Sequence, residues 1–236
     1  MATVFEASGI IAMFRRPYTT TSSVSYPLPT PTAVAGLLAA IIGLDNGSGD
    51  QGFAANYWPA LKGTRIAIQI LAPLKWHSAT LNFWNLKEPQ KNPHIQVKHQ
   101  FISRPRYRFY VQGGIEEALT QHLSKGTFVY TPYLGVAYAL ADIKYCGNYP
   151  WQPLEPQQVD VVTVVPHTPG LEMDILASGG AFRERIPYRL EQDRSLVETL
   201  PIIYQTDPRK KLRLLKWGEL DVTRCGEDIV TWFPAW

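Results

Sequence analysis

The sequence predicts an α+β fold in which two short helices connect the strands of one sheet. Three observations support this prediction: an alternating amino-terminal strand, an all-apolar helix after it, and a second helix enclosed by later strand patterns. From residue 2 to about residue 143 the order is strand, helix, strand, strand, helix, strand. This is the split βαβ, or ferredoxin-like, βαββαβ arrangement that RNA-recognition modules also use.

The first strand and the first helix form the expected centre of the chain. Residues 2–8 alternate in the manner of a strand, and residues 31–42 are apolar on every side. Thr30 suits the N-cap, Pro31 the first helical position and Gly43 the left-handed C-terminal turn. Three helical turns are far short of the ~20 residues that cross a bilayer. The helix is therefore expected in the protein core.

The remaining elements complete the predicted module. Thr64–Leu71 alternates as a second strand, and Arg104–Val111 as a third. Residues at about 73–103 lack a regular period until a short alternation at their end, which suggests an extruded β-ribbon, or thumb. A helix is expected at about 115–124, followed by a fourth strand that runs to about Ile143. Residues 1–146 are thus predicted to form a ferredoxin-like domain with a thumb insertion.

After this domain the chain changes character. Residues 147–236 are rich in β patterns separated by prolines and turns, which predicts a β-rich carboxyl-terminal region packed on the first module. Its strand patterns are Val159–Val165, Tyr188–Leu190 and Leu212–Leu215.

The amino-acid composition limits the possible functions of the protein but does not decide among them. The 236 residues are 45% hydrophobic and 18% charged, and the net charge is only +3, so a nucleic-acid site has to come from local clustering. The two cysteines have no metal-ligand spacing, which fits a reducing cytoplasm and predicts neither a metal nor another cofactor. The amino end has the pattern of a strand, so we expect neither a signal peptide nor a membrane segment.

The clearest charge cluster is the segment 89–115, which contains no acidic residue. Arg104, Arg106 and Arg108 fall on one side of a period-2 pattern, and aromatic residues are interleaved with them. Cations track phosphates and aromatic rings accept unstacked bases, so such a surface suits single-stranded RNA. The alternative is an ordinary solvated strand face.

Two further basic sites stand outside this segment. Arg15 and Arg16 precede Tyr18 and a run of Ser and Thr, a combination that suits a phosphate or sugar cradle; the alternative is a mobile loop with surface charges. The basic run at 209–216 could contact RNA, a partner subunit or nothing, and charge runs are usually solvated; it contains Arg209, Lys210, Lys211, Arg213 and Lys216.

The amino end carries a family resemblance. A first strand, an aromatic-basic turn and the pattern Tyr-Pro-x-Pro-Thr followed by Gly-Leu-Leu resemble the fifth CRISPR-associated (Cas) family, in the RAMP superfamily. The likeness covers about the first 45 residues. Its residues are Phe5, Gly9, Phe14, Arg15, Pro17, Tyr26, Pro27, Pro29, Thr30, Gly36, Leu37 and Leu38.

The resemblance implies an RNA-binding subunit of a type I surveillance (Cascade) complex that caps the 5′ handle of the guide RNA (crRNA) in antiviral defence. It implies contacts with the Cascade backbone subunit and with the large, PAM-reading subunit, and hence indirect proximity to target DNA. With the charge clusters, it gives these candidate RNA-binding residues: Arg15, Arg16, Tyr18, Tyr26, Thr30, Lys98, Arg104, Arg106 and Arg108.

Catalysis is the alternative of a different class. One branch of the resembling family cleaves guide precursors without metal, through tyrosine and an adjacent Lys-His pair, and here Lys98, His99 and either Tyr18 or Tyr26 have those residue types. The base would deprotonate the 2′-OH while lysine stabilises the phosphorane. Because neighbours on a strand point to opposite faces, we expect a non-catalytic protein. A β-rich protein-interaction module is the third alternative.

Overall fold

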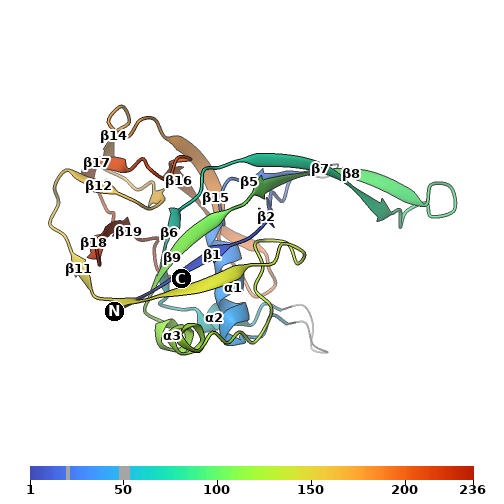
Figure 1. The fold of residues 1–236 in the computed structure, drawn as a ribbon, viewed down its shortest axis with the longest axis horizontal. Coiled ribbons are helices and arrows are strands. Elements are labelled where there is room, and N and C mark those ends of the chain that lie inside the picture. The colour runs from blue at the N-terminus through green and yellow to red at the C-terminus, as the bar shows by residue number, and fades with distance from the viewer. Residues whose placement is uncertain (20–21, 48–53) are drawn as a thin grey trace.

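The computed structural model describes residues 1–19, 22–47 and 54–236 (Figure 1). Its centre is a four-stranded antiparallel sheet with two helices on one face, α1 (Pro31–Ile42) and α3 (Glu116–Lys125). The mixed α+β class is therefore confirmed. The strands of the sheet, in spatial order, are β10 (Asp142–Tyr149), β1 (Ala2–Ser8), β9 (Arg106–Gln112) and β6 (Arg65–Ile70).

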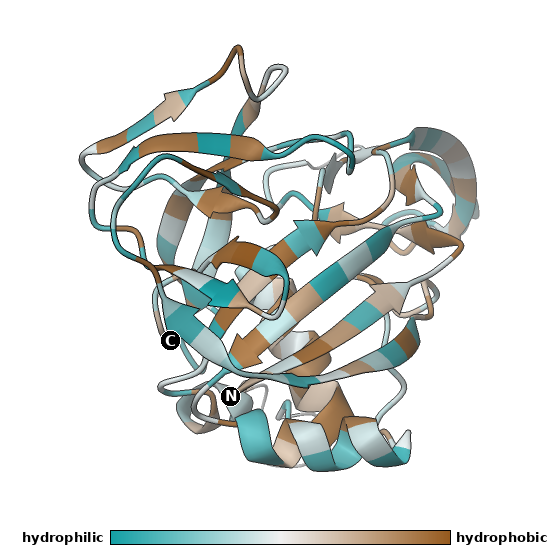
Figure 2. Cartoon of the chain, turned by 60° about the vertical axis from the view of Figure 1, so that its left-hand side comes forward, coloured by the Kyte–Doolittle hydropathy of each residue, from teal (hydrophilic) through white to brown (hydrophobic). Residues whose placement is uncertain are grey.

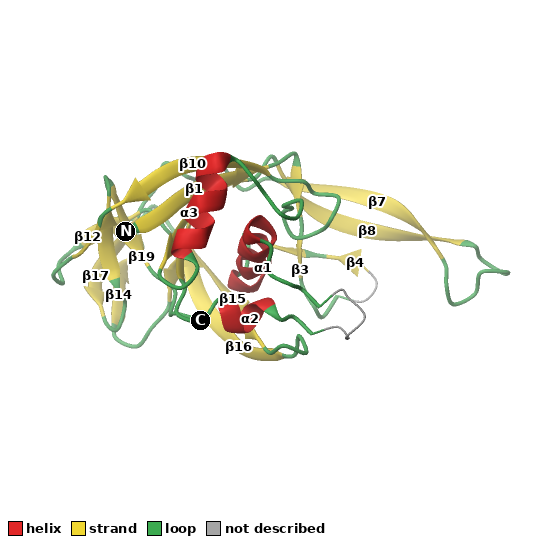
Figure 3. Cartoon of the chain, turned by 90° about the horizontal axis from the view of Figure 1, so that it is seen from below, coloured by secondary structure: helices red, strands yellow, loops and turns green. Residues whose placement is uncertain are grey.

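Helix α1 has the predicted bounds, and both of its ends are capped as expected. The Ala33 N–H donates to the Thr30 hydroxyl at 3.3 Å, and Gly43 takes a left-handed conformation with φ of 81°. Figure 3 shows α1 between the sheet and the hairpin of β15 (Phe182–Leu190) and β16 (Leu196–Tyr204). Because the helix is covered on two sides by one hydrophobic core, it has no polar face.

The fourth strand lies later than predicted, starting at Asp142. Residues 127–141 instead form an extended strap across the end of α1. Backbone N–H groups of Val129 and Tyr130 donate to the carbonyls of Ile41 and Ala40 at 3.2 and 2.9 Å. The strap therefore gives hydrogen-bond partners to carbonyls at the C-terminal end of the helix.

The predicted ribbon is present as two long antiparallel strands, β7 (Trp76–Trp84) and β8 (His94–Ser103), which project from the body (Figure 1). The turn after β1, which contains the short strands β2 to β5, packs on this ribbon. Within that turn, β2 (Ile11–Ala12) and β4 (Ser22–Ser23) pair with β8, and β3 (Phe14–Arg15) pairs with β5 (Ser25–Tyr26).

The carboxyl-terminal region consists of small antiparallel sheets, in which polar and apolar residues are interleaved along the strands (Figure 2). A short helix, α2 (Tyr57–Ala60), lies in the connection before β6. The remaining strands are β11 (Trp151–Pro153), β12 (Val159–Val161), β13 (Val165–Pro166), β14 (Leu171–Asp174), β17 (Leu212–Trp217), β18 (Val222–Cys225) and β19 (Asp228–Thr231).

This region is joined to the amino-terminal module by a shared core and by backbone pairing. Ile186 and Phe233 belong to the same hydrophobic cluster as Phe5 of β1. The Phe233 N–H donates to the Ile66 carbonyl at 2.9 Å, along the outer edge of β6. No helix in the described part of the chain is long and apolar enough to cross a membrane.

Candidate nucleic-acid interface

The turn after β1 holds Arg16 in a fixed position. Its guanidinium lies over the Tyr26 ring, 4.6 Å from the centroid, and donates to both carboxylate oxygens of Glu184 at 3.2 and 2.5 Å. A further bond of 2.7 Å reaches the Tyr18 hydroxyl. Burial alone lowers the pKa of Arg16, but the bonds to Glu184 and Tyr18 outweigh it, so the pKa is raised and the group stays charged.

Arg15 and Tyr18 are the side chains that this turn presents to solvent. Tyr18 is 67% exposed, and Arg15 is exposed with one hydrogen bond, to the Thr19 carbonyl at 3.1 Å. Since strand neighbours point to opposite sides, Arg15 faces away from the buried Phe14. The two predicted arginines of the turn therefore differ: Arg16 is paired, whereas Arg15 is available to a ligand.

Tyr26 and Thr30 are both buried, in contrast to Tyr18. Thr30 caps helix α1, and Tyr26 supports Arg16 from below its guanidinium plane. Burial raises the pKa of Tyr26, against the opposing effect of the Arg16 charge, so its phenol stays protonated at neutral pH. Both residues position the turn rather than lie on its surface.

Lys98 and His99 lie on opposite faces of the ribbon. Lys98 is exposed, while His99 is only 4% exposed and its ring stacks between Phe83 and Phe101, at centroid distances of 5.5 and 5.8 Å. Because the parallel pairing with β4 sets Ser22 opposite Lys98, this lysine lies close to the turn after β1. The structure therefore does not bring Lys98 and His99 to one point.

The prediction that Arg104 shares a strand face with Arg106 and Arg108 is wrong. Arg104 lies in the tight turn between β8 and β9, with φ of 47°, and its N–H donates to the Ile10 carbonyl at 2.8 Å. Pro105, which follows, has no N–H to donate to a neighbouring strand, and β9 starts only at Arg106. Arg104 is nevertheless exposed, at the base of the ribbon.

Arg106 and Arg108 do share a face, and one carboxylate binds them both. Glu6, opposite Arg108 on β1, accepts from Arg106 at 2.6 Å and from Arg108 at 2.8 Å; Arg108 also reaches Asp228 at 3.2 Å. Burial raises the pKa of Glu6, but both arginines outweigh it and hold the pKa below its usual value. Segment 89–115 thus contains no acidic residue of its own, but carboxylates from β1 and β19 bind its arginines in the folded protein.

The third basic run is also largely paired within the protein. Ion pairs join Arg209 to Asp207, Arg213 to Asp160, and Lys216 to Glu172. Lys210 and Gln205 both reach the glycine loop at residues 178–180, where the Lys210 ammonium donates to the Gly179 carbonyl at 2.9 Å.

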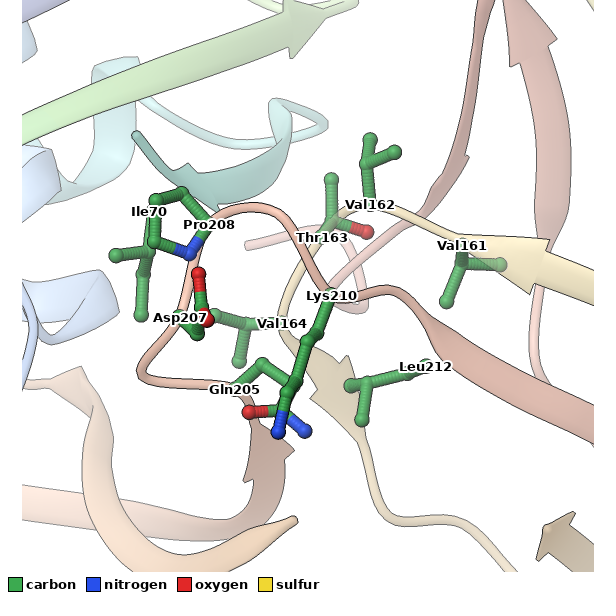
Figure 4. Close-up of a pocket in the computed structure, with 10 residues that line it drawn as sticks. All are labelled: Ile70, Val161, Val162, Thr163, Val164, Gln205, Asp207, Pro208, Lys210 and Leu212. Carbon is green, nitrogen blue, oxygen red and sulfur yellow. The ribbon is translucent and has the colours of Figure 1, made fainter. Parts of the chain in front are cut away.

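Figure 4 shows Gln205 and Lys210 side by side at a cavity of about 20 Å³. That volume has room for about one water molecule. We therefore place no RNA site there.

Strand β15 carries exposed arginines that are not among the candidate residues predicted from the sequence. Arg183, Arg185 and Arg189 are exposed, and Phe182 beside them is 51% exposed. Arg185 donates to the Thr199 hydroxyl at 3.2 Å, and no ion pair of Arg183 or Arg189 occurs within residues 1–19, 22–47 and 54–236. The signal was an arginine at every second position of Arg183-Glu184-Arg185, within the strand pattern.

An antiparallel sheet with helices on one face, a projecting ribbon and a β-rich carboxyl-terminal region make up the fold, and solved CRISPR proteins have a similar fold. The chain is similar to a CRISPR protein from Archaeoglobus fulgidus, with a TM-score of 0.58 and 15% identity over 98% of this chain and 99% of that chain. It is similar to a chain of a CRISPR RNA-guided surveillance complex, with a TM-score of 0.54 and 12% identity over 92% of this chain and 91% of that chain.

A chain of the Type III-B Cmr-beta complex bound to cognate target RNA and AMPPnP gives a TM-score of 0.54 and 10% identity, over 89% and 86% of the two chains. At these identities the likeness shows the fold. The family model described as CRISPR-associated protein (Cas_Cas5) matches residues 3–112, which is just under half of the chain. No curated protein matches the sequence. The family match includes the turn after β1, helix α1 and the ribbon.

Proposed function

We propose that this protein is a non-catalytic subunit of a type I CRISPR surveillance complex that binds the 5′ handle of the guide RNA. The observation that carries the proposal is that Arg15 and Tyr18 are exposed on the turn after β1, and that Lys98 is exposed where β8 pairs with β4 of that turn. Cations bind the phosphates of single-stranded RNA, and exposed rings stack on its unpaired bases. All three residues lie within the family match.

The fold supports this proposal. In chain order the sheet and helices run β1, α1, β6, β9, α3, β10, and the sheet order is β10-β1-β9-β6. We interpret this as a ferredoxin-like RAMP domain with the ribbon as its thumb. The sheet face opposite the helices packs against Trp232 and Val230, so RNA bound by this chain lies outside that face.

The ribbon supports the proposed partners. Its side facing away from Lys98 carries Leu81, Phe83, Ile95 and Val97, each partly or largely exposed. An isolated two-stranded ribbon has little stability in water, and packing against a neighbour stabilises it. We propose the backbone subunit as that neighbour. We also propose a contact with the large subunit, which would bring this chain indirectly close to the target DNA near the PAM.

Cleavage by this chain is not part of the proposal. A catalytic lysine and histidine have to act on one phosphate, and here Lys98 and His99 point to opposite faces. The third candidate, Tyr26, is buried, and its raised pKa disfavours a phenolate base. We propose that another subunit cuts the precursor.

The test uses the purified chain and labelled repeat RNA in EDTA. We expect a shifted, uncut band from the wild type, and weaker binding by Arg15→Ala combined with Tyr18→Ala. Arg209→Ala, an exposed arginine paired with Asp207 on another surface, is the matched control and keeps wild-type affinity. Cleavage that disappears in His99→Ala overturns the non-catalytic proposal in favour of a nuclease. An unshifted band from the wild type favours a protein-interaction module.

A further inference from the structure

We infer that strand β7 of the ribbon is a docking edge, along which a strand of the neighbouring backbone subunit extends the sheet. The occupant is an extended polypeptide segment without charged side chains, held by main-chain hydrogen bonds. This inference rests on the proposed function and deepens it, because it assigns how the ribbon binds the neighbour that is proposed for its apolar side.

The first step is that the outer edge of β7 is open. β7 pairs with β8 in an unbroken antiparallel register, from Trp76 opposite Ile102 to Trp84 opposite His94, and β8 lies between β7 and β4 (Figure 3). In the part of the chain that the structure describes, no second strand pairs with β7, and its residues form no backbone hydrogen bond outside the pair with β8. Since alternate backbone groups of an edge strand point away from its partner, β7 presents a row of unpaired N–H and C=O groups.

The second step is that nothing in the sequence of β7 blocks this edge. Residues 76–84 contain no Asp, Glu, Lys, Arg or Pro, and the pairing with β8 has no bulge. Edge strands of natural proteins carry such charges, prolines or bulges, because an open edge otherwise pairs with other chains. Many edge strands are also kept very short, whereas β7 is nine residues long. The edge of β7 is therefore suited to pairing.

Other sheet edges of this protein are protected. β15 carries three arginines and Pro187, and its register with β16 shifts beside that proline. β10 carries Asp142 and Lys144, and its register with β1 also shifts. The edge of β6 is covered, since the Phe233 N–H donates to the Ile66 carbonyl. β7 has none of these protections, so its open edge is a feature of the ribbon and favours a partner strand as its neighbour.

The third step defines the occupant. A β-ladder needs backbone N–H and C=O groups in alternation, which a polypeptide provides and RNA does not. Leu81 and Phe83 point to one side of β7 and Thr80 and Asn82 to the other, so the side chains on both sides are uncharged. Burying a charge beside them without a partner is unfavourable. The incoming strand therefore alternates apolar residues, beside Leu81 and Phe83, with uncharged polar residues.

The experiment measures amide hydrogen exchange at single-residue resolution, in the chain alone and in its complex with the purified backbone subunit. In the free chain, we expect the amides of residues 76–84 to alternate between slow and fast exchange, because only every second N–H bonds to β8. In the complex, we expect the fast amides to slow by at least about tenfold, so that the alternation disappears. Packing on one side of the ribbon alone leaves the alternation in place.

A matched pair of variants tests the same edge. Asn82 and Gln96 lie opposite each other, so their side chains are on the same side of the ribbon. Asn82→Lys places a charge beside the open edge of β7, and we expect binding of the backbone subunit to weaken by at least about tenfold. Gln96→Lys adds the same charge on β8 and is expected to keep wild-type affinity. Thermal melting checks that both variants are folded.

The outcomes separate this inference from the proposed function. If the fast amides keep their free-chain rates in the complex, or if the two lysine variants bind the subunit with equal affinity, the inference is wrong and binding of handle RNA is unaffected. If handle RNA alone slows the same amides, the edge lies against RNA and the inference is also wrong. If the chain binds neither handle RNA nor the backbone subunit, the proposed function fails and the inference fails with it.

Discussion

Two arginine pairs of this protein look alike in sequence and differ in space. Arg106 and Arg108 both bind Glu6, and Arg108 also binds Asp228, so their charge is largely neutralised within the protein. In the turn after β1, Arg16 binds Glu184 while Arg15 stays available. The difference teaches that the cations of a basic segment are open to a ligand only where no carboxylate from another element reaches them.

The largest expected effect is the loss of Glu6, whose side chain is 6% exposed between the two arginines. Glu6→Gln removes the shared anion. Because the two arginines left behind are partly exposed, we expect the free energy of unfolding to fall by about 3 kcal/mol, the lower end of the range for breaking a buried pair. Urea denaturation measures it. An unchanged unfolding midpoint would contradict our account of this pair.

The same carboxylate predicts a pH dependence. Because the folded-state pKa of Glu6 is lowered, its contribution to stability is present above the unfolded-state pKa and is lost as the pH falls through the folded-state pKa. Stability of the wild type therefore decreases in acid more steeply than that of Glu6→Gln. The check is the unfolding midpoint of both proteins from pH 7 downward; parallel curves would exclude Glu6 as the source.

The comparison is sharpest in RNA binding. Arg15→Ala is expected to reduce the log–log salt slope of handle binding by about 0.7, the value for one single-strand phosphate contact. Arg106→Ala is expected to leave that slope unchanged, because this guanidinium is already paired with Glu6. Equal reductions in the two variants would show that pairing within the protein does not decide which arginine binds.

A smaller effect is expected from Glu184→Gln. The Arg16 pair is partly buried, with about a fifth of each side chain exposed, and Arg16 keeps its contacts with Tyr18 and Tyr26. We expect a loss of about 1–3 kcal/mol in stability, the range for hydrogen bonds to charged groups. Handle affinity should decrease a few fold as Arg15 and Tyr18 lose their fixed position. Calorimetry and anisotropy on one preparation test both.

The smallest effect is expected from His99→Ala on handle affinity. The His99 ring is buried between Phe83 and Phe101, so it makes no direct contribution to phosphate attraction. Lys98→Ala, one residue away on the exposed face, is the matched comparison and should weaken binding. If His99→Ala weakened binding more than Lys98→Ala, RNA would bind the face of the ribbon that carries His99, and our assignment would be wrong.

Local signals explain what could be predicted from the sequence. Helix α1 was found with its bounds because Thr30, Pro31 and Gly43 mark its ends and its apolar pattern needs no distant partner. The first strand and the ribbon were recognised in the same way. The fourth strand was misplaced because residues 127–141 pair with the end of α1, a contact that no local pattern announces.

The candidate site was harder to predict because its decisive contacts are distant in sequence. Arg108 and Glu6 are 102 residues apart, and Arg16 and Glu184 are 168 apart. The period-2 pattern predicts Arg104 within the third strand, whereas in the structure Arg104 lies in the turn before Pro105. The arginines of β15 were missed because Glu184 between them made the segment look charge-balanced.

The bond between Arg16 and Glu184 also has a consequence in time. A chain growing from its amino end exposes Arg15, Arg16 and Tyr18 long before β15 has been made. Until Glu184 leaves the ribosome, the turn has its cations but lacks the carboxylate that fixes Arg16 against Tyr26. The nascent protein therefore carries the residues of the proposed RNA surface early and acquires their arrangement late, so we expect capture of RNA to wait until most of the molecule has been synthesised.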